Sequence, residues 1–185
     1  MNIPNFLSLL RIILVPVFVI FLIQKEYDQA LITFTVAGLT DALDGALARL
    51  LKCQTKLGAF LDPVADKLLL VTSFVSLALF NLIPGWLAVI VISRDFIILL
   101  GIAILTMMSI PYEIKPAIVG KITTALQVAT IFFVLVYKAF THNFSYLWIE
   151  GLCWATAVFT VVSGLTYIIR GISIVNQSDP KELKK

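Results

Sequence analysis

The sequence predicts an all-α, polytopic membrane protein with six transmembrane helices. The chain of 185 residues is 60% hydrophobic and only 14% charged, and its mean hydropathy is +1.01. These values lie outside the range of ordinary soluble domains. The apolar residues are gathered in long runs, and a bilayer core of about 30 Å needs roughly 20 helical residues per span. The length therefore accommodates about six spans with short loops.

Each predicted helix follows one apolar run. The runs fall at about 12–23, 29–40, 67–80, 85–110, 122–137 and 146–169. The first is kept as a helix because no basic region precedes it and no small-residue cleavage site lies before Gln24. The second is long enough only if it continues through residues 41–51, and the fourth only if it carries Arg94 and Asp95. Both extensions bring charge into the membrane region.

Helix breakers agree with these boundaries. The third run ends at a hairpin signal, NLIPG at 81–85, and the fifth begins after two prolines around a charged turn at 109–116. The sixth follows a polar stretch at 137–145. We expect one membrane domain over 1–175 and a solvated C-terminal tail over 176–185.

The positions of Lys and Arg predict the orientation. Basic residues cluster after the second run, around the turn between the fourth and fifth, and at the C-terminus. By the positive-inside rule both termini face the cytoplasm, which an even number of spans allows. The net charge of +3 is too small to indicate a nucleic-acid partner.

Four aspartates form the candidate catalytic constellation. Asp41 and Asp44 are three residues apart, and Asp62 and Asp66 four apart, so each pair lies on one face of its helix. A short turn around 52–58 would let the pairs face each other at the cytoplasmic boundary. Unpaired carboxylates are expensive to bury, whereas Mg²⁺ or Mn²⁺ prefers such oxygen ligands. The pattern predicts two divalent ions.

A solvated cytoplasmic rim is the alternative interpretation, in which the aspartates pair with Arg49, Lys52, Lys56 and Lys67. The spacing D-x2-D-G-x2-A-R-x8-G-x3-D-x3-D over 41–66 is too ordered for that interpretation. Small residues also keep the helix face thin beside the carboxylates and open the turn, so that a ligand could approach the backbone. They are Gly45, Ala48 and Gly58.

Every fixed position of this spacing matches the signature of the CDP-alcohol phosphatidyltransferases, which the chain therefore resembles. The opening NIPNFLSLLR is similar to that of the bacterial phosphatidylglycerophosphate synthases, a group within the family. The resemblance implies transfer of a phosphatidyl group from CDP-diacylglycerol to an alcohol, with release of CMP. It implies that Asp41, Asp44 and Asp62 are metal ligands and that Asp66 is both ligand and general base. The CDP-diacylglycerol-binding positions that it implies are Pro4, Asn5, Gly45, Ala48, Arg49, Thr55 and Gly58.

Three further cations suit an anionic acceptor, which we expect to be glycerol 3-phosphate. They are Arg94, Lys121 and Arg170. The alternatives are neutralisation of Arg94 by Asp95 and snorkelling of the other two to lipid headgroups. In phosphatidylglycerophosphate synthases a lysine usually stands where this chain has Thr123. The stretch IKPAIVGKITTALQ also resembles the cardiolipin synthases of the same superfamily, whose acceptor is phosphatidylglycerol, and this is the second expectation.

A cation carrier or channel is the alternative of another class, because carboxylates within membranes also mark ion pathways. That alternative predicts carboxylates spread through the membrane depth, whereas these cluster at one boundary. The resemblance implies contact with membrane lipids, a homodimer and a place in the bacterial inner (cell) membrane. The orientation predicted from Lys and Arg makes the active site face the cytoplasm.

Overall fold

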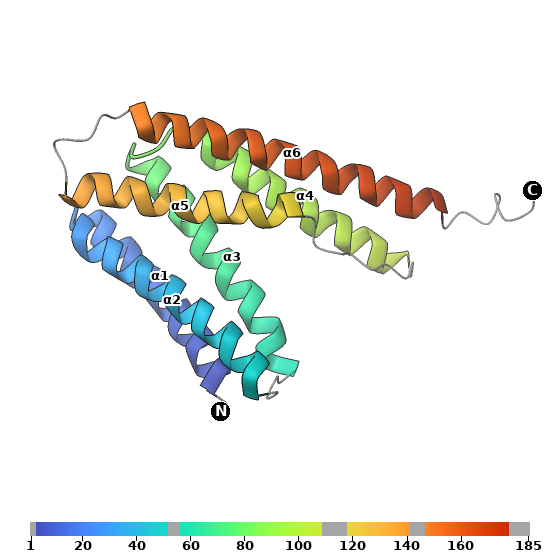
Figure 1. Ribbon diagram of the computed structural model, residues 1–185, viewed down its shortest axis with the longest axis horizontal. Coiled ribbons are helices and arrows are strands. Elements are labelled where there is room, and N and C mark those ends of the chain that lie inside the picture. Colours follow the sequence, from blue (N-terminus) through green and yellow to red (C-terminus); the bar gives the residue numbers. More distant parts are fainter. Residues whose placement is uncertain (1–2, 52–55, 109–117, 141–146, 178–185) are drawn as a thin grey trace, which may run out of the picture.

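The computed structural model describes residues 3–51, 56–108, 118–140 and 147–177, and the side chains of 8–40, 64–108, 118–140 and 147–176. All regular structure in these ranges is helical, which confirms the all-α class and the six helices (Figure 1). The helices are α1 (Ile3–Ile23), α2 (Tyr27–Leu51), α3 (Lys56–Leu79), α4 (Gly85–Met107), α5 (Ile118–Phe140) and α6 (Leu147–Gln177).

The six helices meet at one end of the bundle and diverge toward the other. In Figure 1 the common end lies at the left, from which α1, α2 and α3 run downward while α4, α5 and α6 run to the right. Helix α1 packs against α2 and α3, and α6 packs against α4 and α5. Contacts of α2 with α5 and of α3 with α4 and α5 join the two groups.

Two tight turns at the common end reverse the chain. Lys25 follows α1 with φ of 60°, and Asn81 follows α3 with φ of 55°. This left-handed conformation is one that asparagine tolerates better than most residues. Pro84 then caps the start of α4, which suits a residue with a fixed φ and no N–H to donate. The hairpin predicted at 81–85 is therefore confirmed.

The apolar core fills the common end. Phe18 of α1 and Phe34 of α2 pack with ring centroids 5.9 Å apart, and Phe74, Leu87 and Leu135 are fully buried in the same cluster. Large apolar side chains also cover the outside of the helices. Helices α4, α5 and α6 are each long and apolar enough to cross a membrane.

Two predicted helix extensions are confirmed, whereas the turn predicted around 52–58 ends earlier than expected. Helix α2 continues to Leu51, and α4 carries Arg94 and Asp95. Helix α3 already begins at Lys56, so Gly58 lies in its first turn and not in the connection. The first turn tolerates glycine because its N–H groups have no intrahelical partner. Helix α6 ends at Gln177, and the tail beyond it lies outside the described residues.

Candidate functional site

The four predicted metal ligands lie on two consecutive helices. Asp41 and Asp44 are in the second half of α2, and Asp62 and Asp66 are in the first half of α3. Only the Asp66 side chain is among those the structure describes. Thr55 lies outside the described residues, as do the side chains of the other predicted donor-binding positions, which are Pro4, Asn5, Gly45, Ala48, Arg49 and Gly58.

Asp66 forms an ion pair with Arg11 of α1. The Arg11 side chain is fully buried, whereas that of Asp66 is 41% exposed. A buried guanidinium without a carboxylate partner would be costly. The pair therefore anchors α1 to α3 at Asp66, the predicted base. The sequence signal for Arg11 is a lone cation directly before the apolar run 12–23.

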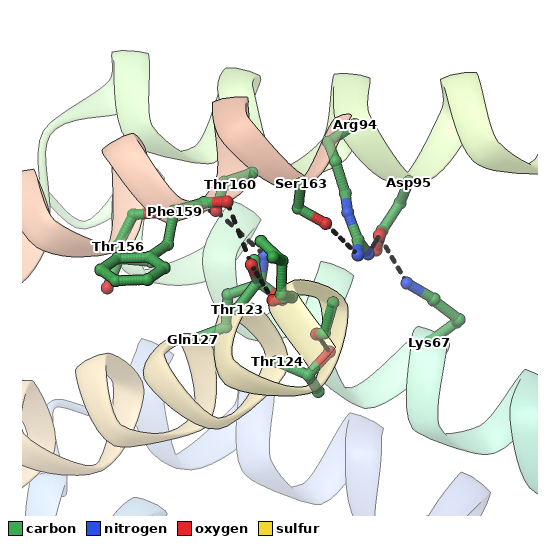
Figure 2. Close-up of polar contacts among 12 residues, drawn as sticks. Lys67, Arg94, Asp95, Thr123, Thr124, Gln127, Thr156, Phe159, Thr160 and Ser163 are labelled. Carbon is green, nitrogen blue, oxygen red and sulfur yellow. Dashed lines mark hydrogen bonds and ion pairs between the residues drawn. The ribbon is translucent and has the colours of Figure 1, made fainter. Parts of the chain in front are cut away.

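Lys67, the next residue of α3, points to a different helix. Its Nζ atom lies 2.5 Å from Oδ1 of Asp95 on α4, and the same oxygen accepts a hydrogen bond of 2.8 Å from Arg94 (Figure 2). The contact between Arg94 and Asp95 is the charge neutralisation that the sequence left open as an alternative to acceptor binding by Arg94. For Lys67, the described partner is Asp95 and not one of the four aspartates.

Arg94 is held on a second side by α6. Its guanidinium donates a hydrogen bond of 2.9 Å to Ser163 Oγ (Figure 2) and lies 5.6 Å from the ring centroid of Tyr167. Two glycines leave room for it. A Cβ atom on Gly120 would lie 3.5 Å from an Arg94 guanidinium nitrogen and 3.0 Å from the Tyr167 hydroxyl, and one on Gly164 would lie 3.5 Å from Arg94 Cγ.

Lys67, Arg94, Gly120 and Tyr167 border a cavity of about 960 Å³ that residues of α2, α3, α4, α5 and α6 line. Of the described residues, three cations line it, Lys67, Arg94 and Lys121, together with small and apolar residues. The structure thus brings two of the three predicted acceptor-binding cations together. It adds Lys67, and it places Arg170 on a separate cavity of about 570 Å³ between α4 and α6.

Thr123 does not line the cavity with Lys121. It is fully buried, and its hydroxyl lies 2.8 Å from the Val119 carbonyl of its own helix and 3.0 Å from the Phe159 carbonyl of α6 (Figure 2). The position that departs from the phosphatidylglycerophosphate synthase pattern is therefore a helix-packing position in this chain. Thr124 borders the cavity instead.

The donor set fits the predicted divalent ions by its chemistry. Four carboxylates offer only oxygen, the ligand type that Mg²⁺ and Mn²⁺ prefer. Among the described residues, no three His, Cys, Asp or Glu side chains converge as a metal-binding group. Three of the four aspartate side chains lie outside that set, so the predicted ligand set stays a prediction.

Long apolar helices around a cavity whose described lining includes Lys67, Arg94 and Lys121 define a membrane-type helical bundle. Residues 1–166 match the CDP-alcohol phosphatidyltransferase family, and the chain belongs to this family. The prediction of a phosphatidyltransferase enzyme of phospholipid biosynthesis is thereby confirmed. Divalent metal ions are the cofactors of this family. A carrier or channel has no support from this membership.

The relatives include proteins with two different functions. The CDP-diacylglycerol–glycerol-3-phosphate 3-phosphatidyltransferase of Bacillus subtilis is 31% identical, over 96% of this chain and 99% of its own length. The cardiolipin synthase (CMP-forming) of Homo sapiens is 34% identical over 90% of this chain, which covers 60% of that protein. A CDP-diacylglycerol–glycerol-3-phosphate 3-phosphatidyltransferase of Haemophilus influenzae is 48% identical over 52% of this chain and 55% of its own length.

Proposed function

We propose that the protein transfers a phosphatidyl group from CDP-diacylglycerol to glycerol 3-phosphate, giving phosphatidylglycerophosphate and CMP. A hydroxyl of the acceptor attacks the phosphatidyl phosphorus, and the bond from that phosphorus to the CMP oxygen breaks. The hydroxyl proton passes to a carboxylate base. The family supports the reaction class, and the Bacillus subtilis relative, by its name, supports this donor and this acceptor.

The charge of the cavity is the observation that carries the choice of acceptor. Lys67, Arg94 and Lys121 line it, and Asp95 offsets one of these charges by pairing with the first two. Two positive charges remain among the described residues of this site. A phosphate monoester carries between one and a half and two negative charges at neutral pH, on the order of −2. Glycerol 3-phosphate matches this balance better than a phosphodiester does.

The aspartates would carry the chemistry. We assign Asp41, Asp44, Asp62 and Asp66 as ligands of two Mg²⁺ or Mn²⁺ ions, which when bound would neutralise charge on the diphosphate and on the leaving CMP. Asp66 is also the proposed base, and its ion pair with Arg11 supports a fixed orientation of the carboxylate. The donor would contact Pro4, Asn5, Gly45, Ala48, Arg49, Thr55 and Gly58.

Cardiolipin synthesis is the second candidate, because most of the cavity wall is apolar. Beyond the cations the lining includes Phe34, Leu39, Val128, Phe132 and Phe133. A cavity of about 960 Å³ also exceeds the needs of glycerol 3-phosphate alone. Both features suit the acyl chains of phosphatidylglycerol, although the acyl chains of the donor would use the same surface.

The membrane arrangement follows the same proposal. Residues 1–175 would form one domain with six spans, both termini and the active site would face the cytoplasm, and residues 176–185 would be a solvated tail. The starts of α1, α3 and α5 and the ends of α2, α4 and α6 all lie away from the common end (Figure 1), which supports an antiparallel bundle with its termini on one side. We further propose the bacterial inner membrane as its location and a homodimer as its assembly.

The experiment supplies purified protein with CDP-diacylglycerol, a divalent ion and either glycerol 3-phosphate or phosphatidylglycerol, and analyses the lipid products. We expect phosphatidylglycerophosphate from the first acceptor. Arg94→Gln and Lys121→Gln should each raise the KM for glycerol 3-phosphate about tenfold, the effect of losing one charge-assisted hydrogen bond. The KM for CDP-diacylglycerol should change little.

Two further variants sharpen the result. Lys138→Gln makes the same change at the exposed C-terminal turn of α5 and should leave both KM values unchanged. Arg170→Gln tests the third candidate cation. It should raise the KM for glycerol 3-phosphate less than the other two substitutions, because Arg170 lines the other cavity. Formation of cardiolipin from phosphatidylglycerol, with no use of glycerol 3-phosphate, would refute the chosen acceptor.

A further inference from the structure

We propose that Asp95 is a positioning residue for anion recognition, which acts by holding Lys67 and Arg94 at the cavity wall. This inference deepens the proposed function and rests on it, since the anion is the phosphate of the acceptor. Asp95 is 4% exposed and is absent from the cavity lining. Its carboxylate therefore acts through the two cations.

One oxygen atom serves both cations. Oδ1 of Asp95 lies 2.5 Å from Lys67 Nζ and 2.8 Å from Arg94 Nη1. The two cations come from different helices, α3 and α4. The position of one carboxylate oxygen thus sets the distance between two charges that border the same cavity, and that distance decides whether one phosphate group can contact both.

The arrangement leaves donors for a ligand. An ammonium group has three N–H donors and a guanidinium five. The side chain of Lys67 is 40% exposed while that of Arg94 is 8% exposed, so Lys67 can direct its remaining donors into the cavity. Arg94 is fixed by Ser163 on its other edge and by the Tyr167 ring.

The same cluster is poorly optimised as a purely structural element. Oδ2 of Asp95 and Nε of Arg94 are buried with no hydrogen-bond partner within the described part of the chain. Burying an ion pair costs desolvation energy that is recovered only when the remaining polar atoms are also satisfied, and an unsatisfied buried group calls for an explanation. Holding two cations at the cavity wall, at the expense of these two atoms, supplies one.

The test compares Asp95→Asn with wild type, because Asn keeps the size of the side chain and removes its charge. We expect the KM for glycerol 3-phosphate to rise about tenfold, as for loss of one charge-assisted hydrogen bond. The KM for CDP-diacylglycerol should stay within about twofold, the scatter of independent sites. Asp95→Glu keeps the charge and moves the carboxylate oxygen. We expect it to raise the KM for glycerol 3-phosphate less, by about threefold.

Asp28→Asn is the matched control, since Asp28 is exposed in the first turn of α2 and should leave both KM values unchanged. An unchanged acceptor KM in Asp95→Asn would overturn the inference, as would a loss of kcat alone. If Asp95→Asn does not fold, Asp95→Glu decides in the same way, and failure of both variants to fold would assign Asp95 a structural role only. A different result would refute the proposed acceptor, namely that wild-type protein uses phosphatidylglycerol and not glycerol 3-phosphate. The inference about Asp95 is then tested by comparing the KM for phosphatidylglycerol in each variant with that of wild type.

Discussion

Lys67 of α3 and Asp95 of α4 form an ion pair 2.5 Å long that joins the two groups of helices beside the cavity. The preceding residue, Asp66, pairs with Arg11 of α1. Successive residues of a helix point about 100° apart, so these neighbours reach two different helices, α1 and α4. Ion pairs thereby connect the first half of α3 both to α1 and to α4. The position of α3 therefore affects both the proposed base and the proposed anion site.

Removal of divalent ions should stop the reaction. Four carboxylates on α2 and α3 would repel one another if they gather, and the ion pair of Arg11 with Asp66 supplies only one positive charge. The family uses divalent metals. We expect CMP release to fall to background after chelation and to return when Mg²⁺ or Mn²⁺ is added in excess. Undiminished turnover in thoroughly chelated protein would contradict the metal assignment.

Asp66→Asn should abolish transfer without unfolding the protein. The substitution keeps the size of the side chain and an oxygen that can accept from Arg11, but it removes the basic carboxylate. We expect CMP release to fall at least about a hundredfold, as for loss of a general base. The amount of folded protein, measured by gel filtration in detergent, should match wild type, and near-normal turnover would remove Asp66 from the mechanism.

Gly120→Ala should weaken acceptor binding through crowding. The added Cβ would lie 3.0 Å from the Tyr167 hydroxyl and 3.5 Å from an Arg94 nitrogen, so both side chains must shift. We expect the KM for glycerol 3-phosphate to rise on the order of fivefold, equivalent to about 1 kcal/mol of overpacking. Gly151→Ala, where a Cβ meets nothing within 4 Å, is the control, and equal KM values in the two variants would count against this role of Gly120.

Thr123→Val should lower stability and leave the acceptor preference unchanged. Valine has the same shape, but it cannot donate to the Val119 or Phe159 carbonyl. We expect the free energy of unfolding in detergent to fall by about 1 kcal/mol. Thr106→Val provides the comparison, because Thr106 is exposed and its hydroxyl donates to the Ile102 carbonyl of its own helix. A changed ratio of glycerol 3-phosphate to phosphatidylglycerol use would show that Thr123 does affect the acceptor.

The helices were predictable because their signals are local. Run length, prolines and the hairpin at 81–85 determine where each helix can begin and end, and the span requirement predicted that α2 reaches Leu51 and that α4 carries Arg94 and Asp95. The start of α3 was placed less well. Gly58 resembles a turn residue in sequence, yet the first turn of a helix accepts it.

The partners of the charged side chains were not predictable in the same way. Arg11 and Asp66 are 55 residues apart and meet only because α1 packs against α3. Lys67 could have faced the aspartates or α4, and the rotation of α3 about its axis, which tertiary packing determines, decides between them. Thr123 was assigned to the acceptor question for the same reason, since the sequence does not reveal which face of α5 meets α6.

The polar contacts between α5 and α6 bear on how the protein is assembled in a membrane. Thr123, Thr130 and Thr160 each donate to a carbonyl of their own helix, so each helix can enter lipid with these hydroxyls already satisfied. Gln127 differs, because its side-chain amide donates to the Thr160 hydroxyl of the other helix, at 3.4 Å. An amide group left in hydrocarbon favours association with a polar neighbour. We therefore expect α5 and α6 to insert as separate helices and Gln127 to favour their pairing afterwards.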